Sequence, residues 1–207
     1  MNIAILTSPD QWFVPYAKML CEQISGSELF FHHQDITESF DTVFILSYHK
    51  IIPQQFLEKH RHNIVVHASA LPQGKGWAPL FWQVLEGKNK IPFTLFEATE
   101  QMDNGDIYFQ DTLVLTGYEL NDELRDKQAK HTLAMCHTFI NTYELMKKTP
   151  QTGVESQYPK RTKNDSRLDI DQSIREQFNL LRIVNNTEYP AFFEINGHRY
   201  ILKIEEE

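Results

Sequence analysis

The chain has 207 residues, of which 41% are apolar, and its 20 Lys and Arg against 28 Asp and Glu give a formal net charge of −8. This size and composition suit one main domain with a small appendage, and they exclude a disordered chain or a disulfide scaffold. The acidic balance disfavours general binding of nucleic acid or of an anionic membrane, and no apolar run reaches the ~20 residues of a membrane span. No export signal is visible at the N-terminus, and Cys21 and Cys136 lie in apolar, helix-like stretches, so we expect reduced thiols in a cytoplasmic protein.

The first 150 residues alternate between short apolar runs of strand length and stretches with a helical period. Strands are expected at residues 2–6, 29–31, 42–46, 63–67, 93–96 and 106–115, and helices at 14–24, 53–60, 79–86 and 121–147. Strands alternating with helices predict an α/β fold whose Rossmann-like, mostly parallel sheet lies between layers of helices.

A composition shift near Thr149 begins a polar, turn-prone stretch that we interpret as a surface connection. Residues 171–184 recover a helical period, and residues 192–204 form two β-like runs around Asn196-Gly197, which is the strongest short hairpin signal. We therefore predict a domain of residues 1–150 followed by a C-terminal extension of residues 151–207, which adds a small helix and a β-hairpin.

Two residues with catalytic chemistry fall near the edge of the predicted sheet. His67 ends an apolar strand, and Asp103 lies in a turn-rich loop after the next strand. Ligands of open α/β sheets bind at the carboxyl ends of the strands, and an Asp that orients a His allows the pair to relay a proton. A structural histidine and a turn aspartate remain the alternative.

Two other site types are not supported by the spacing. Gly74-Lys75-Gly76 lacks the spacing of a nucleotide-binding P-loop. The histidines are scattered and no Cys cluster joins them, so we expect no metal site.

The stretch from His67 to Asp106 resembles the core of the folate-dependent formyltransferases. The family pattern is Asn-x-His, Ser-Leu-Leu-Pro, a basic residue with Gly, a Pro, and later Asp-x-Gly. The matching residues are His67, Ser69, Leu71-Pro72, Lys75-Gly76, Pro79, Thr94 and Asp103-Asn104-Gly105. Upstream, Ser47 to Leu57 is similar to the family's Tyr-Gly-x-Ile-Leu-Pro segment, which lines the pterin pocket. The resemblance covers roughly residues 1–115 and implies the formyltransferase fold.

The resemblance also implies a reaction in which a primary amine attacks the formyl carbon of the cosubstrate N10-formyltetrahydrofolate. His67 would stabilise the oxyanion, and Asp103 would hold His67 and help to remove the amine proton. The folate-binding residues implied are His49, Lys50, Ile52, Leu71, Glu100, Gln101 and Met102. The residues expected to contact the acceptor are Trp12, Lys75 and Arg161.

One member of the family pattern is missing. The family's Asn lies two residues before the His, and here that position is Val65, which cannot donate to an oxyanion. Asn63 is on the same strand face but about 13 Å from His67, against about 7 Å for the usual place. We favour a structural role for Asn63. Catalysis then uses His67 with a backbone donor, another side chain substitutes, or the protein is inactive.

The tail indicates which amine is formylated. Residues 158–170 and 188–191 are similar to the Arg-x-x-x-Asp and Tyr-Pro-Gly elements of the sugar N-formyltransferases. This implies a nucleotide-linked amino sugar as acceptor, and the branch it most resembles, linked to pseudaminic acid, implies a UDP-linked 4-amino-4,6-dideoxy hexose. Initiator tRNA is disfavoured because the chain is short and acidic. A phosphoribosylglycinamide-type formyltransferase, a hydrolase that deformylates the cofactor, and a non-catalytic folate or nucleotide-sugar binder stay open.

The hairpin expected at residues 192–204 alternates apolar and polar residues. A lone two-stranded hairpin is marginal in water and needs a partner surface. C-terminal strands help to form a dimer in the family branch that the tail resembles, so a homodimer is expected.

Overall fold

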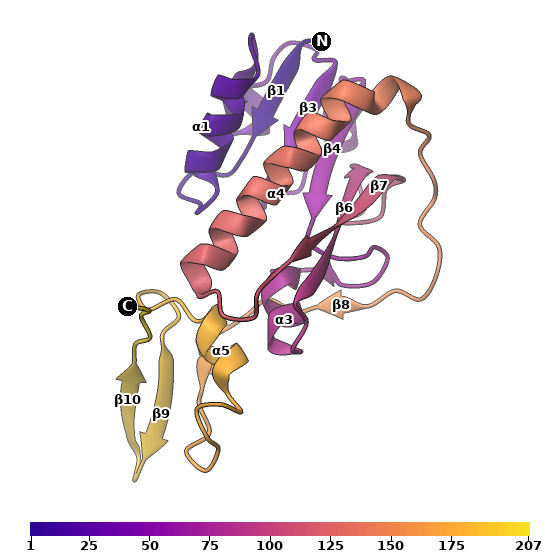
Figure 1. Ribbon diagram of the computed structural model, residues 1–207. Coiled ribbons are helices and arrows are strands. Elements are labelled where there is room, and N and C mark those ends of the chain that lie inside the picture. The colour runs from indigo at the N-terminus through magenta and orange to yellow at the C-terminus, as the bar shows by residue number, and fades with distance from the viewer.

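Six strands form the central sheet in the order β2-β1-β3-β4-β6-β7 (Figure 1). The computed structural model describes residues 1–207. The strands are β1 (Ile3–Leu6), β2 (Glu28–Phe30), β3 (Thr42–Ile45), β4 (His62–His67), β6 (Lys90–Glu97) and β7 (Ile107–Val114). Strands β2, β1, β3 and β4 run parallel, whereas β6 is antiparallel to both β4 and β7. The predicted α/β fold with a mostly parallel sheet is confirmed.

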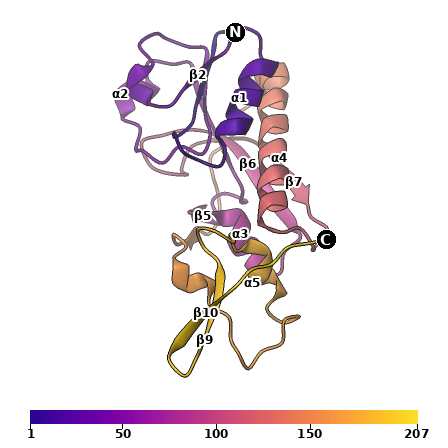
Figure 2. The same cartoon turned by 90° about the vertical axis from the view of Figure 1, so that its left-hand side faces the viewer.

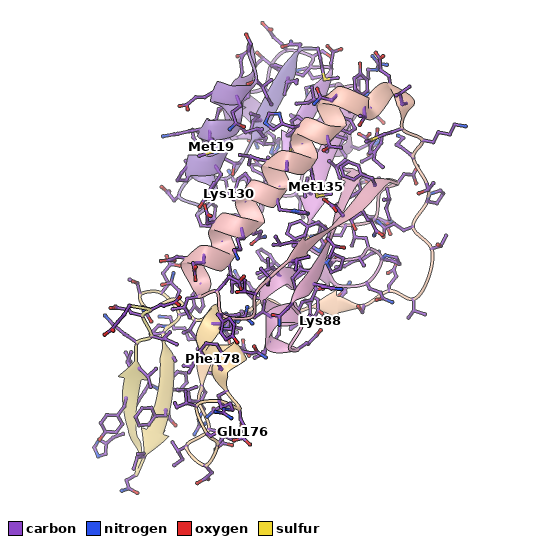
Figure 3. The ribbon with its side chains drawn as sticks, in the orientation of Figure 1. Met19, Lys88, Lys130, Met135, Glu176 and Phe178 are labelled. Carbon is purple, nitrogen blue, oxygen red and sulfur yellow. The ribbon has the colours of Figure 1, made fainter.

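Helices cover both faces of this sheet. Helices α1 (Val14–Gln23) and α4 (Asn121–Thr142) lie on one face, and the short helix α2 (Gln54–Leu57) lies on the other (Figure 2). Residues of α4 that recur every three or four positions are buried in the main core, among them Met135, which is labelled in Figure 3. Helix α4 ends five residues before the expected position and passes into a 3₁₀ turn at Tyr143–Leu145. None of the helices combines the length and the apolar character that a membrane crossing requires.

The C-terminal part begins with a short strand and ends with a hairpin. Strand β8 (Gln157–Tyr158) pairs in parallel with β5 (Lys75–Gly76), which precedes helix α3 (Pro79–Leu85). The predicted hairpin is present as β9 (Ala191–Ile195) and β10 (His198–Leu202). Asn196 and Gly197 have φ of 51° and 81° at its tip, the positive values for which this residue pair is suited.

The helix expected over residues 171–184 is shorter in the structure. Helix α5 spans only Phe178–Ile183, and residues 171–177 form turns. In these turns the Asp169 carboxylate accepts a hydrogen bond from the Asp171 N–H, and Glu176 accepts from the Ser173 N–H. Such local side-chain acceptors compete with helical hydrogen bonding, which explains why the apolar period did not extend the helix. Two further 3₁₀ turns lie at His33–Asp35 and Lys163–Ser166.

A buried ion pair joins the C-terminal extension to the main sheet. Arg182 on α5 and Glu119, before α4, are 1% and 2% exposed and lie 3.0 Å apart, Nη2 to Oε2. Burial alone would raise the pKa of Glu119, but hydrogen bonds from Lys127 and Thr116 outweigh it and hold that pKa below its usual range. Together with the hydrogen bond from Asn121 Nδ2 to the Ile183 carbonyl oxygen, this pair links α5 to the start of α4.

Candidate active site

A cleft of about 390 Å³ lies where the loops after β1, β3, β4 and β6 meet. One part of its lining comes from the α2 side of the sheet, namely residues 45–52, Leu57, Val65 and residues 98–103. The other part comes from the α4 side, namely residues 11–13, 77–79, Arg125, Gln128 and Thr132. His67 belongs to the same lining. The cleft therefore reaches both layers of the fold around the end of β4.

The cleft brings together the two residues expected to carry the chemistry. His67 Nδ1 lies 3.7 Å from Asp103 Oδ1, and both side chains are 10% exposed. His67 Nε2 lies 2.9 Å from the Gly74 carbonyl oxygen, which can only accept, so this nitrogen carries a proton. Asp103 Oδ2 accepts a hydrogen bond of 2.8 Å from the Gly76 N–H. The imidazole is thus held between a carbonyl and a carboxylate.

The loop that carries Asp103 has an unusual backbone. Asp103 has a φ of 53°, in the left-handed region where Asp is among the better tolerated residues. Two residues later, a Cβ on Gly105 would lie 1.6 Å from the Glu97 carbonyl oxygen, so only glycine fits there. Strand β6 ends near the start of β4, whereas His67 is at the end of β4. The loop after β6 must therefore run back along β4 to bring Asp103 to His67, and these two backbone features allow that turn.

A segment expected to be a surface connection supports both site loops. We call residues 149–158 the return segment. Gln151 Nε2 donates to the carbonyl oxygens of Asp103 and Gly105, at 3.0 and 2.9 Å. Ser156 Oγ accepts from the Gly74 N–H at 2.9 Å. Sequence reasoning missed this support because the segment is polar and only two of its residues form a strand.

Most residues expected to bind folate line the cleft. They are His49, Lys50, Ile52, Glu100, Gln101 and Met102. Leu71 is not among the lining residues: it is 4% exposed, and its N–H donates to Thr94 Oγ1 at 3.2 Å. Its place is in the core because the loop after His67 turns inward there. Apolar wall positions are instead occupied by Leu57, Val65 and Phe96.

The three residues expected to contact the acceptor are separated. Trp12 lines the cleft. Lys75 is buried outside the lining, and its ammonium donates to Asn104 Oδ1 at 2.9 Å and to Glu155 Oε1 at 2.7 Å. Arg161 also lies outside the lining and donates to the carbonyl oxygen of Ile183 and to Ser166 Oγ. Lys75 and Arg161 therefore contact other residues of the chain and do not face the cleft. The sequence does not reveal these contacts.

The structure supports a structural role for Asn63. Asn63 is 3% exposed and its Nδ2 donates to the Leu57 carbonyl oxygen at 2.9 Å, whereas Val65 lines the cleft. Arg125 and Gln128 of α4 also line the cleft, and sequence reasoning missed both because no motif distinguishes them on a long polar helix. No group of three His, Cys, Asp or Glu side chains is placed to hold a metal ion.

Comparison with known proteins relates the chain to one family. The formyl transferase family profile matches residues 31–137, just over half of the chain. A methionyl-tRNA formyltransferase of Thermodesulfovibrio yellowstonii is 30% identical over 146 residues, which are 67% of this chain and 46% of the relative. The chain spans about half the length of the relatives it matches.

Solved structures share the fold over essentially the whole chain. Methionyl-tRNA formyltransferase from Clostridium thermocellum has a TM-score of 0.82 at 19% identity, covering 100% of this chain and 93% of its own. A sugar N-formyltransferase from Shewanella has a TM-score of 0.71 at 14% identity, covering 100% and 98%. HypX from Aquifex aeolicus in complex with tetrahydrofolic acid has a TM-score of 0.73 at 20% identity, covering 99% and 37%.

Proposed function

The chain belongs to the formyl transferase family, and from this premise we propose that it transfers a formyl group from N10-formyltetrahydrofolate to a primary amine held in the cleft. The observation that carries the proposal is the contact between His67 and Asp103, 3.7 Å apart in the lining of that cleft. Both residues occupy the positions of the family motif, and the fold turns them toward one another although 36 residues separate them.

The pair suits acyl transfer to an amine. The amine nitrogen forms a bond to the formyl carbon, the carbon–N10 bond breaks, and N10 takes a proton as tetrahydrofolate leaves. His67 Nδ1 faces Asp103, so the proton released by the amine is accepted by this pair, and the carboxylate stabilises the imidazolium that results. The positive imidazolium in turn stabilises the negative oxygen that develops on the formyl group.

The α2 side of the cleft suits the folate. Its volume of about 390 Å³ lies within the range of ~300–1,000 Å³ typical of small-molecule sites. Ile52, Leu57 and Phe96 offer apolar walls for a planar ring, and residues 98–103 offer backbone groups for its polar edge.

We place the reaction in the cytoplasm, in keeping with two free cysteines.

For the acceptor we propose a nucleotide-linked amino sugar, with a UDP-linked 4-amino-4,6-dideoxy hexose as the first candidate. The resemblance of the C-terminal segment to sugar N-formyltransferases supports this choice. The methionyl-tRNA formyltransferase relatives make initiator tRNA the competing acceptor.

A product panel tests the proposal. The protein is incubated with N10-formyltetrahydrofolate and, in turn, nucleotide-linked amino sugars, glycinamide ribonucleotide and methionyl-tRNA, and products are identified by mass spectrometry. A formamide on an amino sugar is expected. Formate released without an amine would instead indicate a hydrolase, binding without any product would indicate a non-catalytic binder, and a formylated methionyl-tRNA would replace the acceptor proposed here.

We also propose that the chain forms a homodimer through the β9–β10 hairpin. The hairpin projects from the rest of the molecule (Figure 1). Ala191 packs in a small core with Leu168 and Leu181, whereas Tyr200 and Ile201 are exposed. A two-stranded hairpin with apolar side chains in water gains stability from a second copy, and two-fold pairs are the commonest assemblies.

A further inference from the structure

Arg125 has an unusual environment in the cleft. Its guanidinium carbon lies 4.3 Å from the centre of the Trp12 ring and 4.2 Å from the centre of the Phe81 ring. Its one hydrogen bond runs from Nη1 to Gln128 Oε1 at 3.3 Å, and no carboxylate oxygen lies within 4.0 Å. Two aromatic rings thus hold the side chain in a fixed place in the cleft lining, but no acid neutralises it.

A second guanidinium without an ion pair, that of Arg161, lies close by; the nearby Asp165 offsets only part of the lowering of its pKa by burial. Asn121 Nδ2 and Arg161 Nη1 both donate to the Ile183 carbonyl oxygen, so they are neighbours. Asn121 is one helical turn before Arg125 and therefore on the same side of α4. Arg161 donates only to neutral oxygens, and its buried Nε has no partner. Burial and then the repulsion from Arg161 lower the pKa of Arg125, and the exposed Glu188 opposes them only in part.

Elsewhere in the molecule buried cations are paired. Arg182 contacts Glu119, and Lys75 contacts Glu155. The chain has 28 acidic residues against 20 basic ones, so it contains enough acids to pair with Arg125. None of them forms an ion pair with it. A cation that is left unpaired beside an open cleft is available to an anionic ligand. Binding of that ligand would offset the free-energy cost of burying the charge.

We propose that Arg125 binds a phosphate group of the acceptor substrate, with the charge of Arg161 adding to the attraction. The inference rests on the proposed function in that the acceptor shares the cleft with the folate. The rings of Trp12 and Phe81 contact Arg125, so the planar edge of the guanidinium is the part that meets the ligand. Its parallel N–H groups match two phosphate oxygens. Trp12, which was expected to contact the acceptor itself, accordingly serves to hold Arg125.

The position of Arg125 decides between two anions that could enter the cleft. The glutamate carboxylates of the folate are the other source of negative charge. Arg125 lies in the α4 part of the lining, with Trp12 and Gln128, whereas the expected pterin residues His49 to Ile52 and Glu100 to Met102 lie in the α2 part. We therefore assign the charge of Arg125 to the acceptor rather than to the folate, whose pterin is expected on the α2 side.

Binding measurements on the full chain test this without requiring turnover. Inorganic pyrophosphate is titrated by calorimetry into wild type, Arg125→Met, Arg125→Lys and the control Lys130→Gln. Lys130 is an exposed cation of the same helix, labelled in Figure 3. Arg125→Met is expected to weaken pyrophosphate binding by about 10-fold to 100-fold, since hydrogen bonds to charged groups contribute ~1.5–3 kcal/mol. Lys130→Gln is expected to leave it unchanged.

Arg125→Lys covers the case in which loss of the cation disturbs folding. Lysine keeps the positive charge but lacks the parallel N–H groups of the guanidinium. Pyrophosphate binding at least about fivefold weaker than wild type is therefore expected. Tetrahydrofolate is titrated into every variant and should bind within twofold of wild type. Pyrophosphate binding that is absent in wild type or equal in all variants would overturn the proposal. A parallel loss of tetrahydrofolate binding would assign Arg125 to the folate glutamate. If no amine is formylated but the pyrophosphate result holds, the proposed function fails and the anion site stands.

Discussion

The Asp103 carboxylate divides its two oxygens between a side chain and the backbone. Oδ1 lies 3.7 Å from His67 Nδ1, while Oδ2 accepts a hydrogen bond from the Gly76 N–H at 2.8 Å. The hydrogen bond from the Gly76 N–H orients the carboxylate. In this orientation Oδ1 faces the imidazole but is too far from Nδ1 for a full hydrogen bond. Protonation of His67 would draw the two groups together, which suits a pair that gains and loses a proton during reaction.

Replacement of His67 tests the role of this pair. His67→Asn removes the imidazole that is proposed to accept the proton and is expected to lower turnover by about 10²–10⁴-fold. Tetrahydrofolate binding should persist, because the expected folate walls are other residues. Turnover and calorimetric binding are measured together, with His198→Asn in the exposed hairpin as control. Turnover at the wild-type rate would remove His67 from the chemistry.

Val65 gives the opposite kind of test. Val65 lines the cleft two residues before His67, where the family pattern has Asn. Val65→Asn is expected to raise turnover by at least about tenfold, because one oxyanion donor contributes ~10²–10³-fold. Val66 also belongs to the cleft lining, but its side chain is on the opposite face of the strand from Val65 and His67, so Val66→Asn is the matched control and should bring no gain. If Val65→Asn were folded and no faster, the chain would already have a second donor, for which Gln128 is the next residue to replace.

The buried Arg182–Glu119 pair makes a stability prediction. Arg182→Met removes the guanidinium partner of a buried carboxylate that keeps its contact with Lys127, and it is expected to cost about 1.5–3 kcal/mol of unfolding free energy. Arg199→Met removes an exposed pair with Glu194 and should cost about 1 kcal/mol or less. Urea unfolding of both variants measures the difference. Similar losses would show that burial of the Arg182 pair adds nothing.

His60 predicts a loss of stability in mild acid. His60 is buried, its Nδ1 accepts from the Phe40 N–H, and its Nε2 has no partner. Burial, and then the nearby Lys59, lower its pKa below the usual value. The unfolded chain therefore binds a proton at a higher pH than the folded chain. The contribution of His60 is complete above about pH 7.5 and is lost as the pH falls through about 6.5 toward the lower folded value.

His60→Asn keeps an acceptor for the Phe40 N–H but does not titrate. Between about pH 7.5 and 5.5 its urea midpoint is expected to fall less than that of wild type, because one proton-binding difference is gone. Some fall should remain, since burial also lowers the pKa of His33 and His131. A fall as steep as in wild type would contradict the assignment.

Light scattering tests the homodimer. The full-length chain is expected to have the mass of a dimer, and deletion of residues 192–207 is expected to yield a monomer. Because Phe192 is buried, Ile201→Asp in the full chain provides a second variant that leaves the small core intact; Ile201 is 61% exposed. It should also dissociate the dimer. A full-length monomer, or a dimer that survives Ile201→Asp, would favour a hairpin that serves its own subunit.

Local patterns predicted much of the fold and part of the site. The strand periodicity located β1, β3 and β4 within one or two residues, and the motif spacing paired His67 with Asp103. Contacts between distant segments could not be read in this way. Leu71 looked like a pocket wall until the inward turn of its loop was known, and the partner of Lys75 is Glu155, 80 residues away. Arg125 is distinguished only by the rings that hold it.

The return segment limits how this chain could exchange its C-terminal end for another. The boundary drawn from composition, at residues 150 and 151, lies within the segment that holds Gly74, Asp103 and Gly105 in place. A chimera joined there would inherit the two candidate catalytic side chains but not the amide and hydroxyl groups that shape their loops. Recombination between relatives is therefore expected to succeed only at junctions after Tyr158, so that residues 149–158 travel with the N-terminal sheet as a single inherited unit.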